Sequence, residues 1–295
     1  MKKQQLGEIG LVSSALFFGV SGVLTQVALT EISPMLLIFY RFILAGIIAL
    51  VVFKINIVKL SKETWSHGLI LSTFLIVIYV ASTYGLKYTS ASNAAFITGS
   101  SVMLIPILNR LFFGKKIKAK DSIGALICLV GLSLVTLKGA EPINKGDLFC
   151  FINAIAYASY IIYSSRMSKD IEVGKISGLQ YVLVALGSGI YLLFNESISI
   201  NMSMDVIFSL ILLGVFCTFL SFLVQITSQR FVVAERAGKI LTLIPVFAVL
   251  FDYLVYGKVM SLEATIGGSL ILMVIVFDEQ ILKVFTKNKM LFENN

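Results

Sequence analysis

The sequence has one histidine, three cysteines and few charged residues, and each shortage excludes a class of protein. His67 stands alone beside a lysine-bearing loop, so catalysis by a histidine-bound metal is excluded, and no metal or cofactor is expected. Cys128, Cys150 and Cys217 lie in or against apolar runs without the spacing of a metal site, and we interpret them as packing residues. Charged residues make up only 14% of the chain, whereas about 25% is usual in soluble domains.

Apolar residues are abundant instead, at 58% of 295 residues, and a water-soluble core could not bury that much apolar surface. Because a membrane-spanning helix needs about 20 mostly apolar residues, the sequence predicts an all-α polytopic membrane protein with ten spans. The spans are expected at residues 9–29, 34–53, 66–86, 91–113, 121–138, 147–166, 176–194, 206–228, 234–256 and 262–282. The first run follows Lys2 and Lys3, and we expect a retained helix there and not a cleaved signal peptide.

Lysine and arginine residues gather in short clusters between the apolar runs, where they orient helices in a bilayer, so no nucleic acid is expected as a partner. With the N-terminus in the cytoplasm, the outer loops hold only Lys87, Lys138, Lys145 and Lys258. This bias predicts a multi-pass protein of the cytoplasmic membrane with both termini in the cytoplasm. The lipid bilayer and a small-molecule substrate are the expected partners.

The stretch Ala91–Leu129 is repeated as Ala234–Leu272 at a shift of 143 residues. Identical positions include Gly114 and Gly257, and a lysine follows each of these glycines. The loop after Gly114 carries four lysines, whereas its copy keeps only Lys258, which is the redistribution of charge that opposite orientations in the membrane require. A long repeat at half the chain length predicts a protein of two similar halves.

The halves are predicted to comprise residues 1–140 and 141–295, with five helices each. An odd number of helices makes the second half enter the membrane upside down, so the halves form an inverted repeat with a substrate site expected near the midplane between them. The small residues of GALICLVG, from Gly124, and of IGGSL, from Ile266, are expected to pack the halves together. A homodimer through these residues is the alternative to a monomer.

The stretches that carry a family resemblance are YTSASNAAFITGSS…LFFGKKI from Tyr88, VVAERAGKILTLIPVFAVLFDYLVYGKVM from Val232 and PMLLIFYRFILAG from Pro34. Together they resemble the EamA family, the ten-helix members of the drug/metabolite transporter superfamily. The resemblance implies a 5+5 inverted-repeat bundle that exports or exchanges small metabolites. Two positions depart from the family pattern. Val102 stands where many members have proline, with Pro106 one turn later, and Ile244 stands where an acidic residue often precedes the second-half proline, so no role of that carboxylate is expected here.

Polar residues on one face of a spanning helix indicate a cavity or a partner helix. Such faces recur in four of the expected spans. They are Ser14, Phe18, Ser21 and Thr25 in the first, Tyr79, Ser82 and Thr83 in the third, Asn153, Tyr157, Tyr160 and Ser164 in the sixth, and Ser221, Gln225 and Ser228 in the eighth. A cavity wall for a substrate is one interpretation, and interhelical hydrogen bonding is the other. Aromatic rings with amide and hydroxyl groups suit a neutral or zwitterionic organic solute.

Charged residues within the expected spans are few. Arg41 and Asp252 lie near the outer ends of their spans, and they either pair as an outer gate or reach the headgroups by snorkelling. Lys239, with Thr242 on the same face, either binds a substrate carboxylate or phosphate near the cytoplasmic mouth or is a snorkelling anchor. The middle of the first and sixth spans holds no carboxylate. Proton-driven export of cationic drugs, as small members of the superfamily perform it, is therefore disfavoured.

These features favour an alternating-access transporter of small organic metabolites. An enzyme is disfavoured because the spans contain no histidine and no paired carboxylates. A channel is disfavoured because the two halves are inverted and no ring of charge is present. Export or exchange of amino acids or related metabolites is the first choice, and multidrug or toxicant efflux is the alternative.

Overall fold

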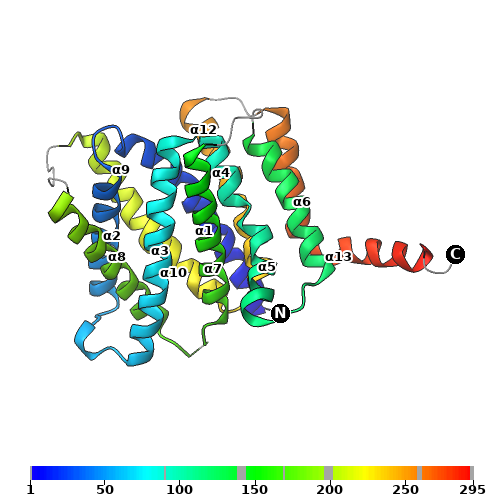
Figure 1. The fold of residues 1–295 in the computed structure, drawn as a ribbon, viewed down its shortest axis with the longest axis horizontal. Helices are drawn as coiled ribbons and strands as arrows, with labels where there is room; N and C mark the ends of the chain where they lie inside the picture. The colour runs from blue at the N-terminus through cyan, green and yellow to red at the C-terminus, as the bar shows by residue number, and fades with distance from the viewer. Residues whose placement is uncertain are drawn as a thin grey trace.

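The computed structural model describes residues 2–89, 91–137, 144–168, 170–195, 202–257 and 261–292. In these ranges the chain is a bundle of helices without β-strands (Figure 1), so the all-α prediction is confirmed. The first half contains α1 (Lys2–Ala28), α2 (Pro34–Val52), the 3₁₀ turn η1 (Ile57–Lys59), α3 (Lys62–Tyr88), α4 (Ala91–Gly99), α5 (Ser101–Phe113) and α6 (Ala119–Thr136). The second half contains α7 (Lys145–Arg166), α8 (Val173–Asn195), α9 (Met204–Gly214), the π-helical segment η2 (Val215–Leu220), α10 (Ser221–Gln229), α11 (Ala234–Leu241), α12 (Leu243–Tyr256) and α13 (Leu262–Phe292).

Each expected span coincides with one helix or with consecutive helical segments. α4 with α5, and α11 with α12, cover one expected span each, and α9, η2 and α10 cover another. Eight segments of the described chain are long and apolar enough to cross a bilayer, and Leu262–Phe277 is a shorter apolar helix. Large apolar side chains such as Leu111 and Phe194 remain exposed on these helices, as expected where a protein faces lipid. The chain is thus polytopic, and the count of ten crossings stays a prediction.

Two helices are interrupted at matching places in the repeat. The break between α4 and α5 falls at Ser100, and the break between α11 and α12 falls at Thr242. The 143-residue shift places Ser100 on Leu243, so the two breaks differ by one residue. At the far ends of these helices, Gly114 and Gly257 adopt left-handed backbone conformations with φ of 62° and 65°. Glycine takes this conformation without steric cost, so the repeated glycines of the sequence end α5 and α12.

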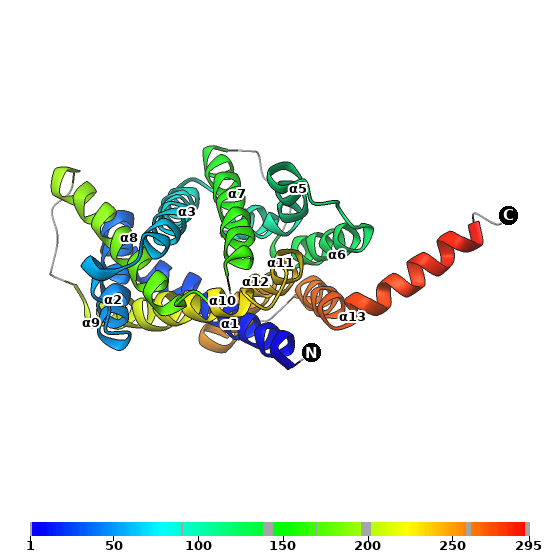
Figure 2. The same ribbon diagram turned by 90° about the horizontal axis from the view of Figure 1, so that it is seen from below.

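The two halves pack on each other reciprocally (Figure 2). α2 packs along α8, its counterpart in the other half, and α6 packs along α13. The first helix of each half packs against later helices of the other half, α1 against α10 and α12, and α7 against α3, α4 and α5. Where α6 meets α13, a methyl group on Gly131 would fall 2.7 Å from the carbonyl oxygen of Gly267. The expected packing of these two helices through small residues is confirmed.

The two ends of the bundle differ in charge. One end, called the basic end below, holds the start of α1, the α2–α3, α5–α6 and α7–α8 connections and the start of α11 (bottom of Figure 1). Its cations include Lys54, Lys115, Arg166 and Arg236. The opposite end holds the C-termini of α1, α3 and α6 and the N-termini of α7 and α13. The alternation of the helices therefore collects the basic clusters of the sequence at one end.

Candidate functional site

A cavity of about 510 Å³ lies where the two helix breaks meet, and its size is within the range of small-molecule sites. Residues beside both breaks line it, among them Gly99, Ser101, Leu241 and Thr242. The remaining walls come from α1, α3, α6, α7, α12 and α13. Interrupted helices at corresponding positions of two halves are the usual place of a transporter's substrate site, so this cavity is the candidate site.

The cavity wall is mostly apolar, with a few polar groups. Phe18 and Tyr157 contribute aromatic rings, and Thr98, Asn153 and Thr242 contribute hydroxyl and amide groups. Within the described part of the chain, no charged residue lines the cavity. Such a wall suits an uncharged or zwitterionic solute with an apolar portion.

Two polar atoms in this wall make no hydrogen bond of standard geometry with the described residues. They are Oδ1 of Asn153 and the hydroxyl of Tyr157, which lies beside the Gln225 side chain. The amide nitrogen of Asn153 donates to Oγ1 of Thr98 at 3.2 Å, which holds the side chain against α4. Buried polar groups are nearly always paired, and an unpaired one costs about 1–3 kcal/mol. The unpaired acceptor and the unpaired hydroxyl are therefore available to a bound solute.

The cavity lies in the half of the bundle away from the basic end. Its α1 residues run from Phe18 to Gln26, toward the C-terminus of that helix. Cys150 belongs to the N-terminal part of α7, and Ala264 belongs to the first turn of α13. These are the helix ends that lie opposite the basic end.

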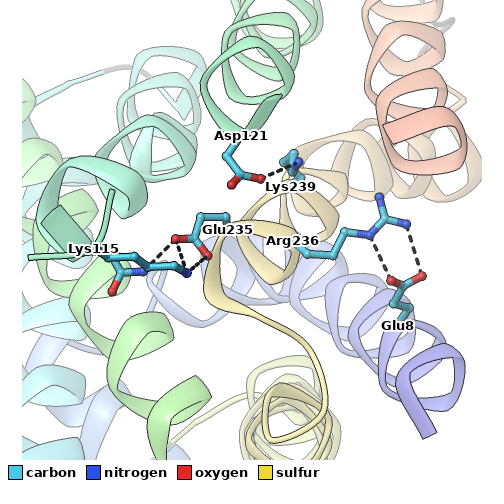
Figure 3. Close-up of polar contacts among 7 residues, drawn as sticks. Glu8, Lys115, Asp121, Glu235, Arg236 and Lys239 are labelled. Atoms are coloured by element: carbon cyan, nitrogen blue, oxygen red, sulfur yellow. Dashed lines mark hydrogen bonds and ion pairs between the residues drawn. The ribbon is translucent and has the colours of Figure 1, made fainter. Parts of the chain in front are cut away.

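At the basic end, three ion pairs among the described residues join α11 to the first half of the chain (Figure 3). With their N–O distances, they are Lys115–Glu235 at 2.8 Å, Arg236–Glu8 at 3.0 Å and Lys239–Asp121 at 3.6 Å. Glu8 lies in α1, Lys115 follows α5 and Asp121 lies in α6. The short helix α11 is thus held against three separate parts of the other half.

Asn109 extends this network between α5, α7 and α11. Its Nδ2 donates to Oε1 of Glu235 at 2.9 Å, and its Oδ1 accepts from Nη2 of Arg166 at 3.1 Å. Asn109 and Glu235 are both buried, and buried charges are screened less by salt than exposed ones. Directional polar contacts therefore link α5, α7 and α11 at the basic end.

The structure divides the predicted substrate-binding residues into two groups. Those that line the cavity are Phe18, Asn153, Tyr157 and Thr242. Those placed elsewhere are Ser14, Tyr79, Thr83, Tyr160, Ser221, Gln225 and Lys239. Ser14 donates to the carbonyl oxygen of Ser221 at 2.9 Å, and Thr83 donates to that of Tyr79 at 2.6 Å. For these hydroxyl groups, hydrogen bonding within and between helices is the observed role.

A second buried polar cluster lies between α7, α8 and α10. The hydroxyl of Tyr160 donates to Oε1 of Gln180 at 3.2 Å. Gln225 is fully buried beside Tyr157, and neither its amide oxygen nor its amide nitrogen makes a hydrogen bond of standard geometry with the residues that the structure describes. The cavity does not include this cluster, so a substrate role for Tyr160 and Gln225 stays a prediction.

The snorkelling interpretation of Arg41 and Lys239 is wrong, because their exposed fractions are only 2% and 1%. Lys239 is paired with Asp121, and Nε of Arg41 donates to Oγ1 of Thr218 at 2.9 Å. Both cations point into the bundle and not toward headgroups. The outer-gate pairing of Arg41 with Asp252 stays a prediction, since the Asp252 side chain lies outside the described part of the structure.

The sequence patterns did not predict the ion pairs of α11 or the cavity residues Thr98 and Thr136. For the ion pairs, the available signal was AERAGK at residues 234–239, which places three charges at the start of an apolar span. For Thr98, the signal was the Gly-Ser-Ser run that follows it at 99–101. Small polar residues in succession weaken a helix, and the break occurs there.

A bundle of two reciprocal halves, with interrupted helices around a cavity, is an architecture typical of membrane transporters. The chain belongs to the EamA-like transporter family, whose sequence profile matches residues 5–137 and again residues 144–277. The resemblance given by the repeated stretches is thereby confirmed, and the protein is a multi-pass membrane transporter of this family.

Relatives carry the same general description. An uncharacterized transporter of Archaeoglobus fulgidus is 26% identical over 274 residues, which cover 93% of this chain and 86% of the relative. The uncharacterized transporter YoaV of Bacillus subtilis is 20% identical over 271 residues, which cover 89% of this chain and 93% of the relative. A protein of known crystal structure, 17% identical, has the same fold, with a TM-score of 0.78 over 94% of this chain and 96% of the other.

Proposed function

We propose that the protein is a secondary transporter that moves amino acids or related small metabolites across the cytoplasmic membrane by export or exchange. The observation that carries this proposal is the cavity between the two helix breaks, at one end of a bundle whose other end is closed by ion pairs. In this proposal the basic end, with both termini, faces the cytoplasm.

Alternating access would exchange the open and the closed end. The three ion pairs of α11 would separate, while α1, α4 and α12 would close over the cavity. The breaks at Ser100 and Thr242 suit this motion, because each lets one helical segment move relative to the next. α1 would transmit the change, since it carries Glu8 at the ion pairs and Phe18 at the cavity.

The cavity supports an amino-acid-sized solute better than a lipophilic cation. Phe18 and Tyr157 would contact an aliphatic or aromatic side chain, and Oδ1 of Asn153 would accept a hydrogen bond from an ammonium group. A pump for cationic drugs would be expected to place a carboxylate in its cavity. The described lining residues include none.

Flux assays in proteoliposomes test the proposal with radiolabelled leucine and phenylalanine against tetraphenylphosphonium. We expect saturable amino-acid flux that falls about tenfold in Tyr157→Ala, because a contact worth about 1.4 kcal/mol is lost. Tyr163→Ala is the matched control on the same helix, since the Tyr163 hydroxyl pairs with Nδ1 of His67 at 2.7 Å, away from the cavity. Flux of the cation alone, driven by a pH gradient, would favour drug efflux instead.

A further inference from the structure

Arg41 is a buried cation in the interior of α2. Its Nε donates to Oγ1 of Thr218 at 2.9 Å, while Nη2 lies 3.4 Å from the carbonyl oxygen of Cys217 and 3.5 Å from Oγ of Ser21. The guanidinium also lies over the ring of Tyr79, 4.6 Å from its centroid. All these partners are neutral.

No acidic group compensates this charge within the described part of the chain, where none of the ion pairs includes Arg41. Arginine does not release its proton in proteins. A charged side chain inside a membrane bundle is costly, and it is typically retained because it has a functional partner. An anion supplied from outside the protein would provide that partner, and the expected pairing with Asp252 is the alternative.

A series of aromatic contacts connects Arg41 to one wall of the cavity. Phe18 lines the cavity, and its ring packs on the ring of Phe222 with 4.9 Å between centroids. Phe222 in turn packs on Tyr79, the residue beneath the guanidinium, at 6.2 Å. Ser21, which Nη2 approaches, lies one turn after Phe18 in α1. Along this path the side chains of Phe18 in α1, Phe222 in α10 and Tyr79 in α3 separate Arg41 from the cavity.

Thr218, a residue of η2, holds Nε of Arg41 and leaves the two terminal nitrogens, Nη1 and Nη2, available to a ligand. Oγ1 of Thr218 donates to the carbonyl oxygen of Leu213, five residues earlier, at 2.8 Å, and it accepts from Nε of Arg41. The two contacts of Nη2 are at the long limit of hydrogen bonding. Nη1 makes no hydrogen bond with the residues that the structure describes. Nη1 and Nη2 together form the planar fork that matches a carboxylate.

We propose that Arg41 binds the carboxylate of the transported solute, so that substrates are solutes with a carboxylate and an apolar body. This inference rests on the proposed function. α1 carries Glu8, which pairs with Arg236, as well as Phe18. The motion that separates the ion pair thus also displaces the wall between the cavity and Arg41.

The test compares a carboxylate with its amide on the same carbon skeleton. Proteoliposomes loaded with unlabelled leucine take up labelled leucine by counterflow, and external leucine or leucinamide competes. We expect wild-type protein to prefer leucine at least about tenfold, the factor that corresponds to one charge-assisted hydrogen bond. In Arg41→Gln this preference is expected to vanish, and in Arg41→Lys, which keeps the charge without the fork, it is expected to shrink.

Arg110→Gln is the matched control, because Arg110 is exposed near the end of α5, and its preference is expected to equal that of the wild type. Equal competition by leucine and leucinamide in the wild-type protein would overturn the role of Arg41, and this comparison requires no variant to fold. An unchanged preference in Arg41→Gln would overturn it as well. Both results would leave the proposed function standing, whereas the absence of saturable leucine uptake by the wild type would overturn that function itself.

Discussion

Lys115 and Glu235 join the two halves of the chain through a two-pronged contact, in which Nζ of Lys115 lies 2.8 and 2.9 Å from the two carboxylate oxygens. Lys115 is a repeated residue with Lys258 as its counterpart, but the position equivalent to Glu235 in the first half is Ser92. The sequence therefore provides this ion pair at only one end of an otherwise repeated architecture. The two ends of the transport path must close by different contacts.

Reversal of either charge of this pair is expected to open the basic end. In Lys115→Glu or Glu235→Lys a charge is left without its partner. The Glu235 side chain is buried, but the Lys115 side chain is 37% exposed, so solvent screens part of the lost interaction. The double variant restores the pair and is expected to recover flux. The measurement is labelling of Cys150, which lines the cavity, by an impermeant thiol reagent added at the basic end.

Lys175→Glu is the matched control for these charge reversals. Lys175 pairs with Glu172 at 2.7 Å, also at the basic end, but that pair is exposed, and exposed pairs contribute about 0–1 kcal/mol. Its flux and its Cys150 labelling are expected to match the wild type. Single charge reversals that leave Cys150 as protected as before would show that the α11 pairs do not hold this end closed.

Gly267→Ala is expected to loosen the contact between the two halves. The added carbon would meet the carbonyl oxygen of Gly131 and lie 2.8 Å from the β-carbon of Leu134, and overpacking of this kind costs about 1–3 kcal/mol. The midpoint of thermal unfolding in detergent is expected to fall. Gly22→Ala is the control, because its β-carbon would meet open space and alanine favours a helix over glycine by about 0.5–1 kcal/mol. A midpoint that drops equally in both variants would contradict close packing at Gly267.

Gln225→Leu is expected to raise stability and lower transport at the same time. Leucine removes two buried polar atoms without partners, each of which costs about 1–3 kcal/mol, so the unfolding midpoint rises. Residues kept at such a cost are typical of functional sites, and saturable flux is expected to fall. Gln229→Leu, one turn further along α10 and equally unpaired, should raise the midpoint without loss of flux. Full flux in Gln225→Leu would contradict a role of Gln225 in the substrate path.

The repeat in the sequence predicted the backbone better than it predicted the site. Gly114 and Gly257 mark helix ends because a left-handed cap depends on the local sequence. Tyr157 and Tyr160 are only three residues apart on one helix, yet Tyr157 lines the cavity and Tyr160 hydrogen-bonds to Gln180. The position of α8 decides this difference, and the spacing of the two tyrosines along α7 does not predict where α8 packs. The charged partners of α11 lie more than 100 residues away along the chain, beyond any local pattern.

Lys118 and Lys87 lie at opposite ends of the bundle, so cysteine substitutions there test the orientation of the halves. In intact cells, an impermeant thiol reagent is expected to label Lys87→Cys and Lys258→Cys and to leave Lys118→Cys unlabelled until the membrane is opened. The native Cys128 and Cys217 are buried, and Cys150, which lines the cavity, is replaced by serine in these variants to remove its background. Labelling of Lys118→Cys and Lys258→Cys from the same side would mean that the halves enter the membrane in parallel. The two helix breaks would then not face each other across one transport path. That result would contradict alternating access by an inverted repeat.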